Sequence, residues 1–173
     1  LADEAGVNAA KVRKDLSFFG SFGKRGLGYS VPELAGRLRE ILGLGREWRV
    51  VIVGAGKIGG ALAQYRGFRH RGFNILAAYD NNPEKIGRKL EGIPVRDIEQ
   101  LDRDIQRDRP DIVVLTVPGD EAQRVVDRVV KAGVKAILNF APAQLQAPAD
   151  VAIKTVNMAM ELEGLSFALT NRE

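Results

Sequence analysis

A glycine-rich turn carries the clearest chemical signal in this sequence. Gly54, Gly56 and Gly59 directly follow an apolar run at 50–53, and Asp80 closes a second apolar run at 75–79. The first glycine permits a tight turn, the second lets backbone N–H groups approach a pyrophosphate, and the third lets a helix pack against the strand. This arrangement predicts a dinucleotide-binding site, although the same glycines also suit a turn without a ligand. The predicted cofactor-binding residues of the turn are Gly54, Ala55, Gly56, Lys57, Ile58 and Gly59.

Asp80 indicates which dinucleotide the turn binds. A carboxylate at this position accepts hydrogen bonds from the adenosine ribose hydroxyls and repels the 2′-phosphate of NADP(H). The three residues after Asp80 are two asparagines and a proline, and none is the arginine that often follows in NADP(H) sites. The predicted cofactor is therefore NADH/NAD⁺. Lys85, which is also predicted to contact the cofactor, and Arg88 lie near enough in sequence to leave NADP(H) open.

The first 45 residues carry a different chemistry, that of DNA recognition. A helix ending at Gly6, a turn in which Val7 is buried, and a second helix capped by Asn8 have the spacing of a helix-turn-helix. Val12 and Leu16 fall on one face of the second helix, so its polar residues lie mostly on the side that meets the major groove. The predicted DNA-binding residues of this segment are Asn8, Lys11, Arg13, Lys14 and Ser17.

A glycine-rich stretch at 21–29 follows and is predicted to form a hairpin with a basic tip. Lys24 and Arg25 at the tip are predicted to lie along DNA phosphates as a wing, and Tyr29 is included among the DNA-binding residues. Residues 7–31 contain five cations and one anion, so they account for a charge equal to the whole chain's +4. A solvated basic surface that binds no DNA is the alternative interpretation.

The elements that position these groups can be followed along the chain. A helix that begins near Pro32, with Ser30 as its cap, connects the DNA-binding segment to the glycine turn. Beyond it, strand-like and helix-like segments alternate, which is typical of a Rossmann-type, doubly wound parallel α/β sheet. The predicted strands are 50–53, 75–79, 93–95, 112–117, 136–140 and 151–156, and the predicted helices are 57–65, 98–106 and 121–132.

The carboxyl ends of parallel strands form the ligand-binding edge of such a sheet. Besides the glycine turn and Asp80, two further segments lie at these ends. Their predicted cofactor-binding residues are Thr116, Val117, Pro118, Asn139, Phe140, Ala141 and Pro142. An apolar pocket among them favours the neutral nicotinamide of NADH over the cationic ring of NAD⁺, because burying an unpaired cation is costly.

The last segment, 157–173, is apolar and is predicted to be helical. Such a helix can fold back onto its own domain or reach a second subunit. The sequence thus divides into a winged-helix DNA-binding domain with a linker helix at 1–45, a Rossmann NAD(H)-binding domain at 46–156, and a dimerisation helix at 157–173. The predicted residues of the dimer helix are Met158, Met160, Leu162, Leu165, Phe167 and Leu169.

Composition excludes several classes of function. The absence of cysteine excludes disulfides and thiolate metal sites and fits a cytoplasmic protein. No run approaches the length of a membrane span, and neither a membrane nor a metal partner is predicted. The single histidine, His70, lies in a predicted surface loop, where a solvated side chain is the expected role. Leu1 falls inside the first helix of the DNA-binding motif, so the sequence is expected to be an N-terminally incomplete piece.

In their order along the chain, these motifs resemble the Rex family of bacterial redox-sensing transcriptional repressors. The resemblance spans essentially the whole chain and implies a homodimer that binds a palindromic double-stranded operator when NADH is scarce. It further implies that NADH binding releases the DNA and that the C-terminal helix is exchanged between subunits. Asn82 and Asn157 depart from the family, because acids are common at both positions. The segments that carry the resemblance are 12–16, 19–29, 54–59, 115–118, 122–123 and 137–142.

Two other classes of protein use related folds. A dehydrogenase also needs a substrate domain and a proton donor or acceptor beside the nicotinamide. The only histidine lies in a predicted remote loop and no Tyr-x-x-x-Lys pair occurs, so no enzymatic activity is predicted. A DNA-binding regulator that responds to CoA or another nucleotide is the closer alternative.

Overall fold

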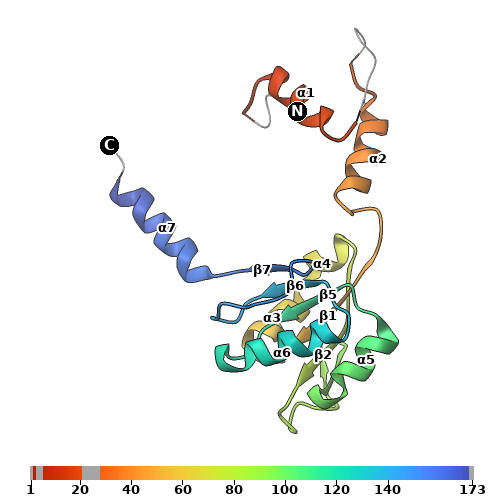
Figure 1. Cartoon of the computed structure of the whole chain (residues 1–173), viewed down its shortest axis with the longest axis vertical. Helices are drawn as coiled ribbons and strands as arrows, with labels where there is room; N and C mark the ends of the chain where they lie inside the picture. Colours follow the sequence, from red (N-terminus) through yellow and green to blue (C-terminus); the bar gives the residue numbers. More distant parts are fainter. Residues whose placement is uncertain (1, 3–5, 21–27, 172–173) are drawn as a thin grey trace. The chain divides into compact units, whose positions relative to one another are not determined.

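The structure is a computed structural model that describes residues 2, 6–20 and 28–171 of the chain (Figure 1). It divides into two units, Leu1–Arg46 and Glu47–Glu173. The described part of the first unit contains two helices, α1 (Ala9–Ser17) and α2 (Val31–Ile41). The helix predicted near Pro32 is thus confirmed as α2.

The turn that precedes α1 agrees with the predicted turn of the DNA-binding motif, whereas most of the helix predicted to end at Gly6 lies outside the described residues. Gly6 has a φ of +62°, and the N–H of Val7 donates to the carbonyl of Ala2 at 3.1 Å, which is the hydrogen bond that closes many helix C-termini. Asn8 then caps α1, because its Oδ1 accepts the N–H of Lys11 at 2.8 Å. Val7 is half-buried, so the prediction that it is buried in the turn is too strong.

The predicted wing falls largely outside the described residues. Lys24 and Arg25, its predicted phosphate contacts, lie in the part of the chain that is not described. Tyr29 is described and half-buried.

The second unit is built on one seven-stranded sheet with the order β3-β4-β2-β1-β5-β6-β7. Neighbouring strands are parallel, as predicted, except for β3 and β4; β3 is an antiparallel edge strand that was not predicted. The six predicted strands are confirmed with shifts of a few residues at their ends. The strands are β1 (Trp48–Val53), β2 (Phe73–Asp80), β3 (Lys89–Leu90), β4 (Ile93–Asp97), β5 (Ile112–Leu115), β6 (Ala136–Asn139) and β7 (Ala152–Thr155).

Helices connect these strands. Tyr65 has an extended ψ of 98°, which ends α3, and a short helix, α4, then begins. His70 ends α4, so the prediction that it lies in a loop is wrong. The helices of the second unit are α3 (Lys57–Gln64), α4 (Arg66–His70), the 3₁₀ helix η1 (Ile98–Gln100), α5 (Leu101–Asp108), α6 (Gly119–Lys131) and α7 (Met158–Thr170).

Alternating residues of β1 show that helices cover both faces of the sheet. Val51 and Val53 pack in one apolar cluster with residues of α5 and α6. Val50 and Ile52 pack in a second cluster that includes Leu62 of α3. Because successive side chains of a strand point to opposite faces, the central strand is apolar throughout and the sheet is doubly wound.

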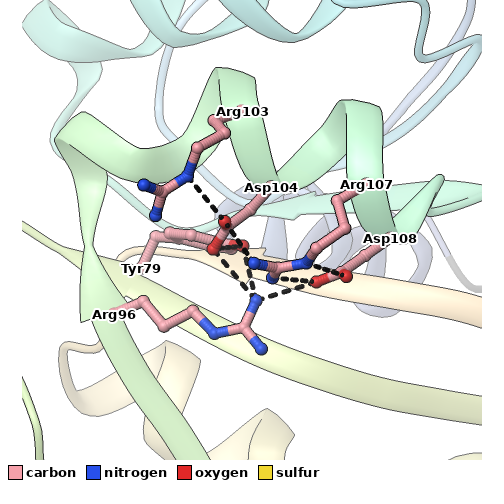
Figure 2. A network of polar contacts seen from close by, with 6 residues as sticks. All are labelled: Tyr79, Arg96, Arg103, Asp104, Arg107 and Asp108. Atoms are coloured by element: carbon pink, nitrogen blue, oxygen red, sulfur yellow. Dashed lines mark hydrogen bonds and ion pairs between the residues drawn. The ribbon is translucent and has the colours of Figure 1, made fainter.

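A buried polar network ties β2, β4 and α5 together (Figure 2). Asp104 is only 1% exposed, and its Oδ2 accepts hydrogen bonds from the Tyr79 hydroxyl at 3.1 Å and from Arg96 Nη1 at 3.0 Å. Its Oδ1 lies 3.1 Å from Arg107 Nη1, and Arg96 also donates to Asp108 at 2.8 Å. Burial raises the pKa of Tyr79 to about 12, so this hydroxyl remains a donor at neutral pH.

Replacing Asp104 by alanine is expected to destabilise the protein by about 3–5 kcal/mol, because Tyr79 and Arg96 then lose the carboxylate that accepts their hydrogen bonds. Asp102 on the same helix forms an ion pair at the surface with the half-buried Arg128, and Asp102→Ala is expected to cost less than about 1 kcal/mol. Urea unfolding of both variants measures the difference. Equal losses of stability in the two variants would show that the buried network contributes no more than a surface pair.

The last helix, α7, presents its apolar residues to solvent. Asn157 caps it by accepting the N–H groups of Ala159 and Met160 at 3.1 and 3.3 Å. Every side chain of α7 is exposed, and its six predicted dimer residues are each 61–71% exposed. No helix among the described residues is long and apolar enough to cross a membrane. Exposed apolar surfaces are often sites of association, and a role of α7 in joining two subunits stays a prediction.

Candidate dinucleotide-binding site

The three glycines of the turn have different surroundings. Gly54 has a φ of +103°, and a Cβ there would lie 2.6 Å from the carbonyl oxygen of Thr116. A Cβ on Gly59 would lie 1.9 Å from the carbonyl oxygen of Gly54. A Cβ on Gly56 would meet nothing within 4 Å, and its φ of −79° suits any residue. The fold therefore requires Gly54 and Gly59, whereas Gly56 leaves open space beside the turn.

Thr116, at the end of β5, holds the turn in place. Its hydroxyl donates to the carbonyls of Gly54 at 2.7 Å and Val53 at 3.1 Å. The N–H of Gly54 in turn donates to the carbonyl of Tyr79 at 2.8 Å. The turn is thus bound to both strands that flank β1, and the Thr116 hydroxyl serves this purpose.

Asp80 ends β2 with its carboxylate beside the turn. It is 8% exposed, and its Oδ2 accepts the N–H of Ala55 at 2.8 Å and the ammonium group of Lys85 at 2.9 Å. Its Oδ1 accepts the N–H of Asn82 at 2.8 Å. Burial by itself raises the pKa of this carboxyl, but the hydrogen bonds from Asn82, Lys85 and Ala55 hold it below its usual value. Asp80 is therefore an anion at neutral pH.

A cleft of about 770 Å³ lies at the carboxyl ends of β1, β2 and β5. This volume is within the range of small-molecule and cofactor sites. The location agrees with the rule that ligands of doubly wound sheets bind at the strand ends. The predicted residues that line the cleft are Gly54, Gly56, Lys57, Ile58, Asp80, Lys85, Thr116, Val117 and Pro118.

The remaining predicted cofactor residues do not line this cleft. Ala55 is buried in the turn, and Gly59 is buried in the first residues of α3. Asn139 is fully buried; its Oδ1 accepts the N–H of Ala141 at 2.8 Å and its Nδ2 donates to the carbonyl of Ala141 at 3.1 Å. Asn139 thus stabilises the turn after β6, and a role of residues 139–142 in cofactor binding stays a prediction.

One wall of the cleft was not predicted from the sequence. It is formed by η1 and by one face of α6. The spacing of Glu121, Val125 and Arg128 places them on that face, and α6 begins just after the predicted segment 116–118. Together, this spacing and the place of α6 in the sequence could have predicted that this face lines the cleft. The lining residues that were not predicted are Val53, Tyr79, Asn81, Ile98, Glu99, Glu121, Arg124, Val125 and Arg128.

The predicted DNA-binding residues of α1 divide into two groups. Lys11, Arg13 and Lys14 are exposed along the helix. Asn8 and Ser17 have side chains bound to the helix backbone, since Asn8 caps it and the Ser17 hydroxyl donates to the carbonyl of Lys14 at 2.6 Å. The three cations are therefore the groups of α1 that are best able to reach DNA.

The fold and the cleft define a nucleotide-binding protein of the Rossmann class. Residues 45–143 match the family described as CoA binding domain. The redox-sensing transcriptional repressor Rex of Desulfitobacterium hafniense is 43% identical to this chain, over 99% of this chain and 82% of that protein. The protein of the same name from Carboxydothermus hydrogenoformans is 47% identical, over 96% of this chain and 80% of that protein. The chain therefore belongs to the Rex family, and its residues 45–143 belong to the CoA binding domain family.

Solved structures of RSP, a Rex-family repressor, are similar over 97% of this chain. RSP in complex with beta-NAD⁺ and operator DNA matches with a TM-score of 0.92 and 41% identity over 77% of that chain. RSP in complex with beta-NADH matches with a TM-score of 0.84 and 39% identity over 78% of that chain. The predicted fold class and the family resemblance are confirmed.

Proposed function

We propose that this chain senses the NADH/NAD⁺ ratio and represses transcription as a homodimer that binds operator DNA and releases it when NADH binds. The observation that carries the proposal is the buried anionic carboxylate of Asp80 beside the open space at Gly56. The carboxylate suits the ribose hydroxyls of a dinucleotide, and the open space at Gly56 suits its pyrophosphate. The complexes of RSP with NAD⁺, NADH and operator DNA support the same assignment.

Asp80 also favours a nicotinamide dinucleotide over CoA. The adenosine ribose of CoA carries a 3′-phosphate, whereas both adenosine ribose hydroxyls of NAD(H) are free. A carboxylate that is 8% exposed accepts hydrogen bonds from a free diol and repels a phosphate. The match to the CoA binding domain family is thus attributed to the shared fold, and CoA remains the second candidate ligand.

Preference for the reduced cofactor is assigned to the apolar part of the cleft. Val117 and Pro118 line it next to the glycine turn. The nicotinamide ring is neutral in NADH and cationic in NAD⁺, and burial of an unpaired cation costs free energy. For NADH to release DNA, it must bind more tightly to the dimer arrangement that does not bind DNA, and DNA must weaken NADH binding by the same factor.

Each segment has a role in this proposal. Residues 1–45 form the winged-helix domain with its linker helix, residues 46–156 bind NAD(H), and residues 157–173 join two subunits. The exposed cations of α1 contact the operator, and the predicted wing residues contact phosphates. The protein acts through binding, so no catalytic residue is assigned, and its proposed location is the cytoplasm.

A titration of the operator complex tests the proposal. A labelled palindromic duplex, selected by the protein from a random pool, is bound and then titrated with NADH, NAD⁺ and CoA while fluorescence anisotropy is recorded. NADH is expected to release the duplex at a concentration about tenfold or more below that of NAD⁺. Equal potency of NADH and NAD⁺ would exclude redox sensing, and release by CoA alone would favour the second candidate.

A further inference from the structure

Lys85 is positioned to act on the group that selects the cofactor. Its Nζ lies 2.9 Å from Oδ2 of Asp80, and its side chain is 39% exposed. The backbone of the loop after β2 holds it there, because the N–H of Lys85 donates to the carbonyl of Asn82 at 3.0 Å, and the N–H of Asn82 donates to Oδ1 of Asp80. The carboxylate is therefore fixed, whereas the ammonium group is partly in solvent.

The hydrogen bonds to Asp80 show what the ribose must displace. A carboxylate offers about four acceptor positions, and Ala55, Lys85 and Asn82 use three of them. A ribose diol bound by both hydroxyls needs two. The backbone donors are fixed by the turn and the loop, so the ammonium group of Lys85 is the donor that must give way or share its acceptor oxygen.

Lys85 also changes the charge that a 2′-phosphate meets. Alone, the Asp80 carboxylate repels the phosphate that distinguishes NADPH from NADH. With an ammonium group at 2.9 Å, the pair has no net charge. A released ammonium group can form a charge-assisted hydrogen bond to that phosphate. Lys85 therefore opposes the effect of Asp80 on the choice between the two cofactors.

We propose that Lys85 is a specificity-determining residue that reduces the selectivity of the cleft for NADH over NADPH. Asp80 supplies the selectivity, and Lys85 limits it, so that NADPH is a weaker second ligand of the same cleft. The inference rests on the proposed function, since it assigns a residue role within the proposed NADH site.

Three single variants of the full chain test this role. Lys85→Met removes the charge and keeps the length of the side chain, and Lys85→Arg keeps the charge. Arg88→Met is the matched control, because Arg88 is an exposed cation of the same loop that, unlike Lys85, does not line the cleft. The dissociation constants of NADH and NADPH are measured for each protein from the fluorescence of the reduced nicotinamide.

The quantity to compare is the dissociation constant of NADPH divided by that of NADH. Lys85→Met is expected to raise this ratio about tenfold or more, because unit charges a few ångströms apart at a protein surface interact strongly. Lys85→Arg is expected to leave this ratio equal to or below that of the unmodified protein, because a guanidinium group keeps the charge and also binds a phosphate. Arg88→Met is expected to keep the ratio within about twofold of the unmodified protein.

An unchanged or lower ratio in Lys85→Met overturns the inference. An equal rise in Arg88→Met also overturns it, because the effect is then one of total charge. In both cases NADH still binds the unmodified protein, so the proposed function stands. If the unmodified protein binds neither cofactor, the proposed function itself fails.

Discussion

Replacing Gly56 by valine is expected to raise the NADH concentration needed to release the operator by about 10- to 100-fold, with operator affinity unchanged. A Cβ at this position meets nothing within 4 Å, so the valine side chain is expected to occupy the open space beside the turn. It thereby keeps a pyrophosphate away from the backbone N–H groups of the turn. A hydrogen bond to a charged group contributes about 1.5–3 kcal/mol, and the loss of one such bond weakens binding by this factor.

Two other glycine variants make the result specific. A Cβ at Gly45 also meets nothing within 4 Å, and Gly45 does not line the cleft, so Gly45→Val is expected to leave NADH binding unchanged. Gly59→Ala brings a Cβ to 1.9 Å from the carbonyl oxygen of Gly54, so it is expected to destabilise the fold. Calorimetry of NADH binding and thermal unfolding separate the two effects. Native NADH affinity in Gly56→Val would mean that the turn does not bind the pyrophosphate.

Replacing both Leu165 and Phe167 by aspartate is expected to convert the dimer into monomers at micromolar concentration. Burial of a large apolar side chain contributes about 1.5–3 kcal/mol, and two buried carboxylates add a further cost. The dissociation constant of the dimer is therefore expected to rise by about 100-fold or more. Affinity for a palindromic operator is expected to fall with it, because two half-sites require two subunits.

Sedimentation equilibrium measures this change directly. Glu163→Gln is the control on the same helix, since it removes a charge and keeps the apolar side chains of α7. This variant is expected to remain dimeric. If the double aspartate variant also remains dimeric, α7 does not hold the subunits together, and its apolar surface must bind something else.

The strands were predictable because their apolar, β-branched runs are bounded by glycines and polar residues. Two short elements, β3 and α4, were not predicted. β3 has two residues and α4 has five, so neither is long enough to show the periodic pattern of apolar residues that identifies a strand or a helix. His70 was placed in a loop for this reason.

The site was predictable at positions that only one residue type can occupy. The positive φ of Gly54 and the close packing at Gly59 follow from the glycine pattern. Pairing between distant segments was not predictable. The spacing of Leu101, Asp104 and Ile105 indicates that Asp104 lies on the buried face of its helix, but no local pattern reveals that partners from two strands meet it there.

The hydrogen bond from the Thr116 hydroxyl to the carbonyl of Gly54 bears on how fast the sensor responds. Because the protein's own contacts hold the turn, NADH capture requires little ordering of the chain. Capture of NADH therefore does not wait for the turn to fold, whereas rearrangement of subunits takes microseconds to seconds. A slow conformational step between NADH binding and the release of DNA is accordingly expected in the movement of the dimer and not in the glycine turn.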